Sequence, residues 1–368
     1  MRRTLPASFY TDPAHFRREI EHFFFRKWLC AGRTDELPAR GDYVLRDVLG
    51  ESVIVARNDL STSPGAGAGI SAMFNVCRHR GTRICETASG TFPGSIQCPY
   101  HAWTYDLCGR LIGAPHMEDV PGFDRRDYPL RSVACDVWDG HVFINLSGGP
   151  VPPLRDHLGE LVDRFRPWRM EDLRRVHRTV YDVKANWKLI IQNYNECLHC
   201  PVLHPLLNQM HHYLGADNAP SEPTYCGGTM GFKEGVETLS RDGKRRRAYL
   251  PGLDAAQKSM VSYFSVYPNL LLTLHPDYMV TVTLWPKAPD RTELVSEWHF
   301  HREEIARPDF VFQDAVDFWD VTNREDWHIS ELSQAGISSR AYTPGPYSNR
   351  ETQLWDFDQV ILKELGLG

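Results

Sequence analysis

The chain has 368 residues, of which 42% are hydrophobic and 24% are charged. These are the proportions of an ordinary globular protein, and the length allows about two or three domains with cores of their own. The 41 basic and 47 acidic side chains leave a net charge of −6, and the basic run at 244–247 gives little support for nucleic-acid binding. No apolar stretch approaches the ~20 residues that a membrane span needs. The two arginines at the N-terminus are not followed by the apolar core of a secretory signal.

The chain contains nine cysteines, an odd number, and no secretory signal accompanies them. Free or metal-bound thiols in a reducing compartment fit this pattern better than a set of disulfides. We therefore expect a cytoplasmic protein. The cysteines are Cys30, Cys77, Cys85, Cys98, Cys108, Cys135, Cys197, Cys200 and Cys226.

Residues 1–40 predict an N-terminal helical segment that packs on the body of the protein, because the apolar residues of 15–29 recur at helical spacing. Residues 41–148 predict a small antiparallel β domain, since short strand-like runs alternate with Gly, Pro, Asn and Asp. The expected strands in this domain are 43–48, 52–57, 72–76, 95–98 and 141–146.

A stretch rich in glycine and proline at 147–154 marks a boundary, so that residues 149–368 form a third, larger part. This part mixes helical and strand patterns, which makes the fold class α+β. The expected helices are 153–165, 189–200 and 309–337, the last ending near Gly336. The expected strands are 178–188, 262–267, 269–275, 278–286 and 293–301.

Two loops of the β domain each carry one cysteine and one histidine. Cys77 and His79 are separated by one residue, and Cys98 and His101 by two. A zinc site can also use two cysteines and two histidines, but the familiar zinc arrangement groups its cysteines first and its histidines later. One pair per loop suits instead a two-iron cluster in which one iron takes both cysteines and the other takes both histidines. Neutral imidazoles in place of two thiolates raise the reduction potential of such a cluster.

A second group of metal-binding side chains lies at 195–205. Glu196 and His199 are three residues apart, on one face of the expected helix. His204 lies five residues beyond His199 and would leave that face, but Pro201 interrupts the helix and allows the chain to turn back. Two neutral histidines and one carboxylate form the facial triad of non-haem iron(II) oxygenases, and the carboxylate need not be local.

Four further residues near this group need an interpretation. Cys197 and Cys200 form a CxxC pair, which by itself would suggest redox or zinc chemistry. We expect both thiols to pack within the helix instead. His211 and His212 are expected to lie on the surface near the site without binding the metal.

The first Cys/His group resembles the Rieske [2Fe–2S] motif of the ring-hydroxylating oxygenase family. The resemblance covers 77–81 and 98–111, and the matching flanking residues are Gly81, Pro99, Tyr100, Trp103 and Tyr105. Rieske proteins of respiratory complexes carry an extra cysteine in each loop, joined as a disulfide. This chain has Tyr100 at the second of those places, so Cys85 is not positioned to form the bridge and the oxygenase version is favoured.

Residues 185–205 resemble the mononuclear-iron motif of the same family. The resemblance implies that His199 and His204 are iron ligands and that the third ligand is an aspartate on a late helix. Asp326 matches that place. The rival acidic residues are Glu325 and Asp320.

In the family, the acid at the position of Glu196 is a bridge and not a ligand. Carried over, Glu196 would connect His101 of one subunit with His199 of the next, in a trimer where the cluster of one subunit serves the iron of its neighbour. Most family members have Asp at this place. Many also have Glu-Asn where this chain has Gln192 and Asn193, which leaves the role of position 192 open.

The resemblance also implies a fold, cofactors and partners. The fold would join a small antiparallel β Rieske domain to a catalytic domain of antiparallel sheet flanked by helices, of the helix-grip type. The cofactors would be a [2Fe–2S] cluster and a mononuclear Fe(II), with O₂ as cosubstrate. Because the sequence has no dinucleotide fingerprint, flavin motif or plant-type ferredoxin cysteines, a separate NAD(P)H-dependent flavin/iron–sulfur reductase must bring the electrons. We expect a homotrimer that binds a small-molecule substrate and no nucleic acid.

Glu196 and the C-terminal sequence resemble the family branch that includes carnitine and glycine betaine monooxygenases. That branch oxidises an N-methyl group or an adjacent carbon of a quaternary ammonium compound. Such a cation cannot donate a hydrogen bond and prefers an aromatic cage. The candidate substrate-binding residues are Tyr194, Trp319, Tyr263 and Tyr213. Tyr194 lies two residues before Glu196 and is expected near the metal, whereas the other three fit an ordinary core aromatic better.

Two other functions stay open. Aromatic side chains would also line a pocket for a flat aromatic acid, so the first alternative is a Rieske oxygenase that hydroxylates or demethylates an aromatic substrate. The second alternative is an electron-transfer Rieske protein without oxygen chemistry. The second histidine group argues against this carrier, which would need only the part of the chain around the first cluster.

Overall fold

The protein is described by a computed structural model, whose described residues are 1–58 and 69–367. The chain forms two compact units. The larger unit comprises Met1–Phe23 with Leu158–Gly368, and the smaller unit comprises Phe24–His157. Residues 24–40, which the sequence assigned to the N-terminal segment, therefore belong to the smaller unit. Among the described residues, no helix combines the length and apolar character needed to cross a membrane.

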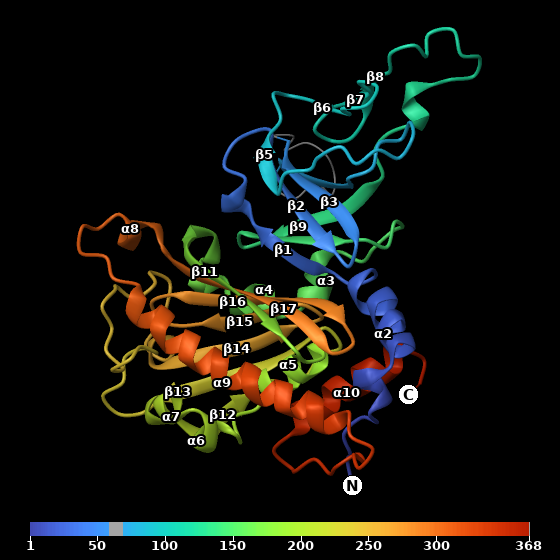
Figure 1. Ribbon diagram of the computed structural model, residues 1–368. Helices are drawn as coiled ribbons and strands as arrows, with labels where there is room; N and C mark the ends of the chain where they lie inside the picture. The colour runs from blue at the N-terminus through green and yellow to red at the C-terminus, as the bar shows by residue number, and fades with distance from the viewer. Residues whose placement is uncertain (59–68, 368) are drawn as a thin grey trace. The chain divides into compact units, whose positions relative to one another are not determined.

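Antiparallel strands build the smaller unit (Figure 1). A seven-stranded sheet has the order β1-β10-β9-β4-β3-β2-β5, and a three-stranded sheet has the order β6-β7-β8. The strands are β1 (Leu29–Arg33), β2 (Asp42–Val48), β3 (Glu51–Arg57), β4 (Ile70–Phe74), β5 (Ser89–Thr91), β6 (Ile96–Gln97), β7 (Thr104–Tyr105), β8 (Leu111–Gly113), β9 (Ser132–Trp138) and β10 (His141–Asn145). Each of the five runs expected to be a strand overlaps one, because alternating burial is a local property of the sequence.

The helical prediction for the first 40 residues is wrong beyond Phe24. Leu29–Arg33 forms strand β1, which pairs with β10 and begins with the buried Leu29 and Cys30. The partner strand is far away in the sequence, so its hydrogen bonds could not be read from the local pattern. Tertiary pairing therefore overrides the helical spacing of this segment.

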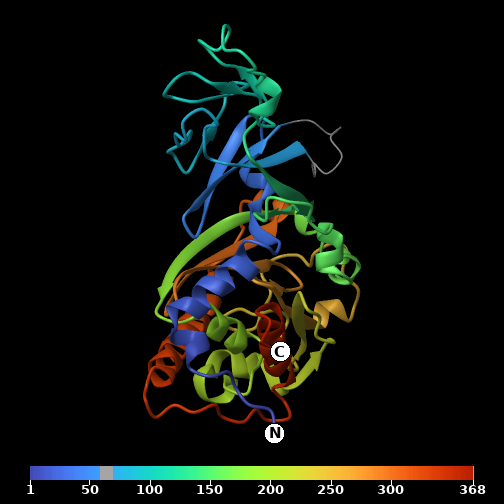
Figure 2. The ribbon, with the colours of Figure 1, turned by 90° about the vertical axis from the view of Figure 1, so that its right-hand side faces the viewer.

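A seven-stranded antiparallel sheet forms the centre of the larger unit, in the order β11-β17-β16-β15-β14-β13-β12. The strands are β11 (Leu173–Val183), β12 (His211–Asn218), β13 (Tyr225–Phe232), β14 (Met260–Val266), β15 (Leu270–Leu274), β16 (Met279–Ala288) and β17 (Arg291–His301). The long helix α9 runs along one face of this sheet, and Figure 2 shows from the side that the edge strand β11 curves strongly. The expected α+β fold, with an antiparallel sheet flanked by helices, is confirmed.

The α-helices of the larger unit cover this sheet and its edges. They are α1 (Ser8–Thr11), α2 (Pro13–Glu19), α4 (Leu161–Arg164), α5 (Trp187–Tyr194), α6 (Cys200–Leu203), α7 (Pro205–Met210), α8 (Arg302–Ile305), α9 (Gln313–Ile337) and α10 (Thr352–Glu364). Helix α3 (Leu154–Leu158) begins in the smaller unit. Gly336 lies inside α9 and does not end it, because the helix continues to Ile337 and Ser338 is its C-cap.

The helix expected over 189–200 is wrong from residue 195 onward. Asn186 caps α5 by accepting a hydrogen bond from the Lys188 N–H, and the helix ends at Tyr194. The next residues form a turn, in which the Glu196 carboxylate accepts the Leu198 N–H at 2.5 Å. A side chain that binds the backbone locally competes with helical hydrogen bonding.

Both chain ends lie at the same end of the larger unit (Figures 1 and 2). The Thr4 N–H donates to the Gly345 carbonyl at 2.9 Å. A buried ion pair also ties the N-terminal segment to α5, because Lys188 Nζ lies 2.6 Å from Glu19 Oε1 and both side chains are fully buried. Burial lowers the pKa of Lys188, and the negative charge of Glu19 opposes this shift. The pair fixes the helix that leads into the 195–199 turn.

We expect Lys188→Met to lower the free energy of unfolding by about 3–5 kcal/mol, because it leaves the Glu19 carboxylate buried without its cation. Urea unfolding followed by tryptophan fluorescence measures the change. The control Lys184→Met removes an exposed lysine of the same region and should change stability by less than about 0.5 kcal/mol.

The double variant Glu19→Gln/Lys188→Met should recover much of the lost stability, because it removes both charges together. A double variant as unstable as Lys188→Met would show that lost packing, and not the unpaired charge, causes the effect.

Candidate metal centres and their cavity

The two Cys/His loops of the smaller unit come together around one point. Cys77 and Cys98 are buried, with 3% and 2% of their surface exposed. His79 is exposed and His101 is half-buried, and their rings lie edge to face with centroids 4.7 Å apart. Two inward thiols and two outward imidazoles fit a two-iron cluster whose histidine-bound iron is nearer to solvent.

Tyr105 supports the cysteine side of this group. Its hydroxyl accepts the Arg78 N–H at 3.0 Å and lies 3.3 Å from Cys77 Sγ. Because the backbone can only donate here, the hydroxyl proton is free to point at the sulfur. A hydrogen bond to a ligand sulfur is one of the factors that set the reduction potential of an iron–sulfur cluster.

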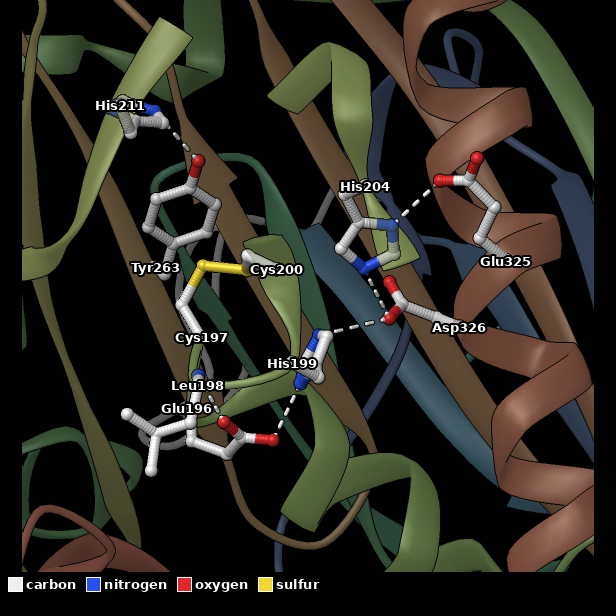
Figure 3. Close-up of a disulfide and its surroundings, with 10 residues drawn as sticks. All are labelled: Glu196, Cys197, Leu198, His199, Cys200, His204, His211, Tyr263, Glu325 and Asp326. Carbon is white, nitrogen blue, oxygen red and sulfur yellow. Dashed lines mark hydrogen bonds and ion pairs between the residues drawn. A yellow bond between two sulfur atoms is a disulfide. The ribbon is translucent and has the colours of Figure 1, made fainter. Parts of the chain in front are cut away.

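The turn between α5 and α6 positions the first histidine of the second group. Glu196 Oε1 lies 2.5 Å from His199 Nδ1, so the carboxylate orients the ring although neither residue is in a helix (Figure 3). Pro201 occupies the start of the short α6, and His204 follows its last residue. The rings of His199 and His204 have centroids 5.1 Å apart. The expected pairing of the two histidines is confirmed, but the expected interruption at Pro201 is wrong. The helix already breaks at 195–199, and the short α6, with His199 as its N-cap and His204 as its C-cap, brings the two rings together.

Helix α9 supplies a carboxylate to these histidines. Asp326 Oδ1 lies 2.9 Å from His204 Nε2 and 3.4 Å from His199 Nε2 (Figure 3). Trp319 and Asp326 are seven residues apart and so lie on the same face of α9. Two imidazole nitrogens and one carboxylate oxygen thus converge on a single point, which is a donor set that a divalent iron fits.

A second carboxylate of α9 contacts the other ring nitrogen of His204. Glu325 Oε2 lies 2.7 Å from His204 Nδ1. Glu196 and Glu325 therefore each accept a hydrogen bond from the Nδ1–H of one histidine, and the Nε2 atoms of both histidines face Asp326. The sequence named Glu325 as a rival third ligand, and the structure gives it this orienting position instead. Asp320 is directed elsewhere, to the Tyr181 hydroxyl at 2.6 Å and to Arg324.

The carboxylates around His199 and His204 favour a positive charge at the point where the side chains converge. Burial lowers the pKa of His199, but hydrogen bonds to Asp326 and Glu196 raise it to about 9. Burial likewise raises the pKa of Asp326, and the two histidines hold it below its usual value. Three carboxylates face two imidazoles, so positive charge at the convergence point is stabilised, whether it is carried by protons or by a metal ion.

Cys197 and Cys200 form a disulfide across the turn that carries His199 (Figure 3). The expectation that all nine cysteines are free or metal-bound is therefore wrong at these two positions, and the other seven are free. Cys200 lies close enough to His199 and His204 to count as a possible metal ligand. In the disulfide its sulfur is not a thiolate, so Asp326 is the better third donor.

Alkylation of the protein, denatured without reductant, should label seven cysteines and leave Cys197 and Cys200 unlabelled. Prior reduction should expose all nine. Mass spectrometry of the peptide that contains residues 197–200 identifies the pair directly, because the disulfide lowers its mass by two hydrogens. Full labelling without reductant would contradict the disulfide.

The second metal group opens into a cavity of about 310 Å³ in the larger unit. His199, His204 and Asp326 line it together with the four aromatic residues that the sequence singled out, Tyr194, Tyr213, Tyr263 and Trp319. The structure thus brings all the expected residues of this group to one space.

The aromatic rings of the cavity are held by their polar atoms. The Tyr194 hydroxyl donates to the Leu272 carbonyl at 3.0 Å, and Trp319 Nε1 donates to His275 Nε2 at 3.1 Å. Tyr263 and Trp319 pack edge to face with centroids 6.3 Å apart. Tyr213 differs from these rings because it is 36% exposed. Since the polar atoms are already bonded, the rings are fixed in place and their faces can pack against a ligand.

His211 is buried behind Tyr263, so the expectation that it lies on the surface is wrong, whereas His212 is exposed. Its Nδ1 lies 2.9 Å from the Gly231 carbonyl, which can only accept, so Nδ1 carries the proton. Burial lowers the pKa of His211 to about 4. The neutral ring therefore accepts the Tyr263 hydroxyl through Nε2, at 3.2 Å.

Gln192 connects α5 to the C-terminal helix. Its Nε2 donates to Asp358 Oδ1 at 2.7 Å, and the Tyr347 hydroxyl donates to Asp358 Oδ2 at 2.8 Å. A glutamate at position 192 would place a second carboxylate against Asp358. The amide instead supplies a donor, which gives position 192 a structural role that the sequence had left open.

The stability of the protein should depend on the protonation of Asp358. Burial raises the pKa of Asp358 to about 7, although Tyr347 and Gln192 oppose the shift. The folded protein therefore keeps this proton up to about pH 7, whereas the unfolded chain releases it near pH ~4. The folded state binds more protons between these values, so this group makes stability fall as the pH rises from about 4 to about 7.

The side chain of Asp358→Asn cannot titrate, so this variant should lack a fall of about 4 kcal/mol in the unfolding free energy between pH ~4 and pH ~7. Urea unfolding at a series of pH values measures the profile. The control Asp356→Asn, on the same helix, should keep the wild-type slope. Parallel profiles for wild type and Asp358→Asn would refute the assignment.

Family comparisons agree with these two centres. Residues 27–124 match the Rieske [2Fe–2S] domain, and residues 170–366 match the catalytic domain of the ring hydroxylating alpha subunit. The chain is 30% identical to the glycine betaine monooxygenase oxygenase subunit of Pseudomonas aeruginosa, over 94% of this chain and 85% of that protein. It is also 30% identical to the carnitine monooxygenase oxygenase subunit of Escherichia coli, over 92% of this chain and 85% of that protein.

Solved structures give the same result. The quaternary ammonium Rieske monooxygenase CntA in complex with its substrate L-carnitine superposes with a TM-score of 0.80 at 25% identity, over 98% of this chain and 95% of that one. Naphthalene 1,2-dioxygenase from Rhodococcus shares the fold, with a TM-score of 0.78 at 20% identity over 98% and 94% of the two chains. The chain therefore belongs to the Rieske non-haem iron oxygenases, enzymes whose oxygenase subunit combines a [2Fe–2S] domain with a mononuclear-iron catalytic domain.

Proposed function

We propose that this chain is the oxygenase component of a monooxygenase that hydroxylates or N-demethylates a quaternary ammonium compound resembling glycine betaine or carnitine. One observation carries the proposal: the cavity that His199, His204 and Asp326 line is also lined by the fixed rings of Tyr263 and Trp319. A quaternary ammonium group has no hydrogen to donate, so aromatic faces are suitable neutral partners for it. The relatives named for glycine betaine and carnitine support the same substrate class.

The proposal assigns each metal-binding group to a cofactor. The [2Fe–2S] cluster would be held by Cys77, His79, Cys98 and His101, and the mononuclear Fe(II) by His199, His204 and Asp326. When bound, the cluster supplies electrons singly and the mononuclear iron activates O₂. The protein's own contribution is to hold both Nε2 atoms toward Asp326 through Glu196 and Glu325.

Glu196 is proposed as a link between subunits of a homotrimer. Its two oxygens contact His199 Nδ1 and the Leu198 N–H, and each carboxylate oxygen can accept a further hydrogen bond. His101 of the partner subunit would donate that further bond, which would connect the cluster of one chain to the iron of the next. Inter-subunit electron transfer has been described for CntA, and this supports the arrangement.

A separate reductase would complete the system. The sequence carries no dinucleotide fingerprint and no flavin motif, so we propose an NAD(P)H-dependent flavin/iron–sulfur protein as the electron donor. We place both components in the cytoplasm, where NAD(P)H is regenerated.

For an N-methyl substrate, the reaction would consume one O₂, two electrons and two protons. One oxygen atom would enter the methyl C–H bond and the other would leave as water. The resulting carbinolamine would then lose formaldehyde and a proton, and give the tertiary amine. Tyr263 and Trp319 would pack on the cationic head group.

Single-turnover experiments test this proposal. Iron-loaded protein is reduced with dithionite, the Rieske EPR signal is recorded, and O₂ is added with glycine betaine, carnitine or benzoate in turn. We expect the Rieske signal, and we expect formaldehyde or a cleaved amine from one of the first two compounds. Turnover of benzoate alone would overturn the substrate class and leave the oxygenase assignment intact.

Asp326→Ala should abolish product formation, because it removes the carboxylate that faces both histidines, and it should leave the Rieske EPR signal unchanged. The control Asp317→Ala removes a half-buried carboxylate of the same helix that does not line the cavity and should keep activity. The two variants are compared by single turnover, iron content and EPR. If Asp326→Ala still forms product at the wild-type rate, the assignment of the third ligand is wrong.

A further inference from the structure

Arg350 is the one lysine or arginine among the described residues that line the cavity. It lies in the segment just before α10, whereas the metal-binding residues come from the 195–204 region and α9. The charged side chains of the remaining lining are the carboxylates of Glu196 and Asp326, beside the two histidines. The cavity thus has acidic residues at the metal group and a cation contributed by a separate segment.

The guanidinium of Arg350 has no partner of its own. Within residues 1–58 and 69–367, the hydrogen bond recorded for Arg350 is made by its backbone N–H, to Ser348 Oγ at 3.3 Å. The adjacent acid, Glu351, does not pair with it, because the Glu351 carboxylate accepts the Ser348 N–H at 2.7 Å. An arginine beside a cavity with five uncommitted donors is able to bind a ligand carboxylate through two parallel hydrogen bonds.

The start of α10 adds to the positive potential at this place. Thr352 and Gln353, its first two residues, also line the cavity. The helix has 13 residues and no acidic residue in its first turn, and its N-cap residue, Glu351, turns its carboxylate to the Ser348 N–H instead of capping the helix. The unpaired N–H groups of a helix N-terminus favour a negative charge.

The segment that carries Arg350 is anchored on both sides. Gln353 is buried, and its Nε2 donates to the carbonyls of Gly227 at 2.7 Å and Ala219 at 3.2 Å. On the other side, the Tyr347 hydroxyl donates to Asp358, which also accepts from Gln192 of α5. The backbone around Arg350 is therefore fixed relative to the sheet and to the helix that precedes the metal group, so its side chain starts from a defined place at the cavity.

We propose that Arg350 binds the carboxylate of the substrate, so that this oxygenase selects zwitterions with both a quaternary ammonium group and a carboxylate. The inference rests on the proposed function and deepens it. The cationic head would pack on Tyr263 and Trp319, and the carboxylate would pair with Arg350. A compound such as choline, which has the cation without the carboxylate, would leave the guanidinium without its partner.

The test compares two ligands that differ only in this charge. Glycine betaine carries a carboxylate, and its carboxamide carries a neutral group of nearly the same shape. Isothermal titration calorimetry on the iron-loaded oxygenase gives the Kd of each, and choline serves as a third ligand. In the wild type, glycine betaine should bind at least about tenfold more tightly than the carboxamide, as expected for a charge-assisted pair. Carnitine replaces glycine betaine if it is the compound that the enzyme turns over.

Arg350→Gln should weaken binding of the carboxylate ligand by about tenfold and change the Kd of the carboxamide by less than about twofold. Arg350→Lys should recover part of the difference, because it restores the charge without the planar fork. The control Arg340→Gln removes an exposed arginine that does not line the cavity, and both Kd values should stay at the wild-type level. The Rieske EPR signal reports that each variant is folded and carries its cluster.

Each outcome decides one question. Equal losses for the carboxylate and carboxamide ligands in Arg350→Gln would overturn the role of Arg350 and leave the quaternary ammonium function standing. Equal affinity of the wild type for both ligands would do the same. Absence of binding and turnover for all quaternary ammonium compounds would overturn the proposed function, and with it this inference.

Discussion

The convergence of His199 and His204 on the carboxylate of Asp326 is the arrangement that the rest of the larger unit maintains. The histidines come from a turn and a short helix, and the carboxylate comes from a helix more than a hundred residues later in the chain. The three carboxylates near these histidines repel one another, and each attracts an imidazole. Hydrogen bonds are therefore needed to hold the five groups in place. Glu196 and Glu325 each accept a hydrogen bond from the Nδ1–H of one histidine. These bonds fix the two rings so that their Nε2 atoms face a common point.

Behind this group, polar contacts that are buried hold α5 in place. Glu19 and Lys188 join it to the N-terminal segment, and Gln192 joins it to Asp358 of α10. These contacts explain why charged and amide side chains occur in the core of the unit. Each is satisfied by a partner from a remote segment, and removal of one partner would leave the other buried without compensation. Both chain ends therefore contribute to the position of a metal group with which neither makes direct contact.

The cavity combines two kinds of recognition. Fixed aromatic rings suit a group that carries charge without hydrogen-bond donors, whereas an arginine and a helix N-terminus suit an anion. The two kinds come from different segments, because the aromatic rings lie on α5, β14, α9 and β12, whereas the arginine lies just before α10.

The sequence by itself determined the parts that depend on short spacings. The sequence alone predicted the Cys77/His79 and Cys98/His101 pairs, the His199/His204 pair and most strands of the two seven-stranded sheets, because each depends on residues close together in the chain. The resemblance to a known family added the partners of these groups, which spacing alone does not give.

Only the tertiary structure decided which distant residues meet. Asp320, Glu325 and Asp326 all lie on α9, and at about 100° per residue they point in different directions, so the packing of the helix selects the one that faces both histidines. Pairing with the distant strand β10 likewise makes Leu29–Arg33 a strand, although the local pattern predicted a helix. The tertiary structure also brings Arg350 to the cavity. The segment before α10 and the turn at Glu196 line one space, although they are far apart in the sequence and no local spacing relates them.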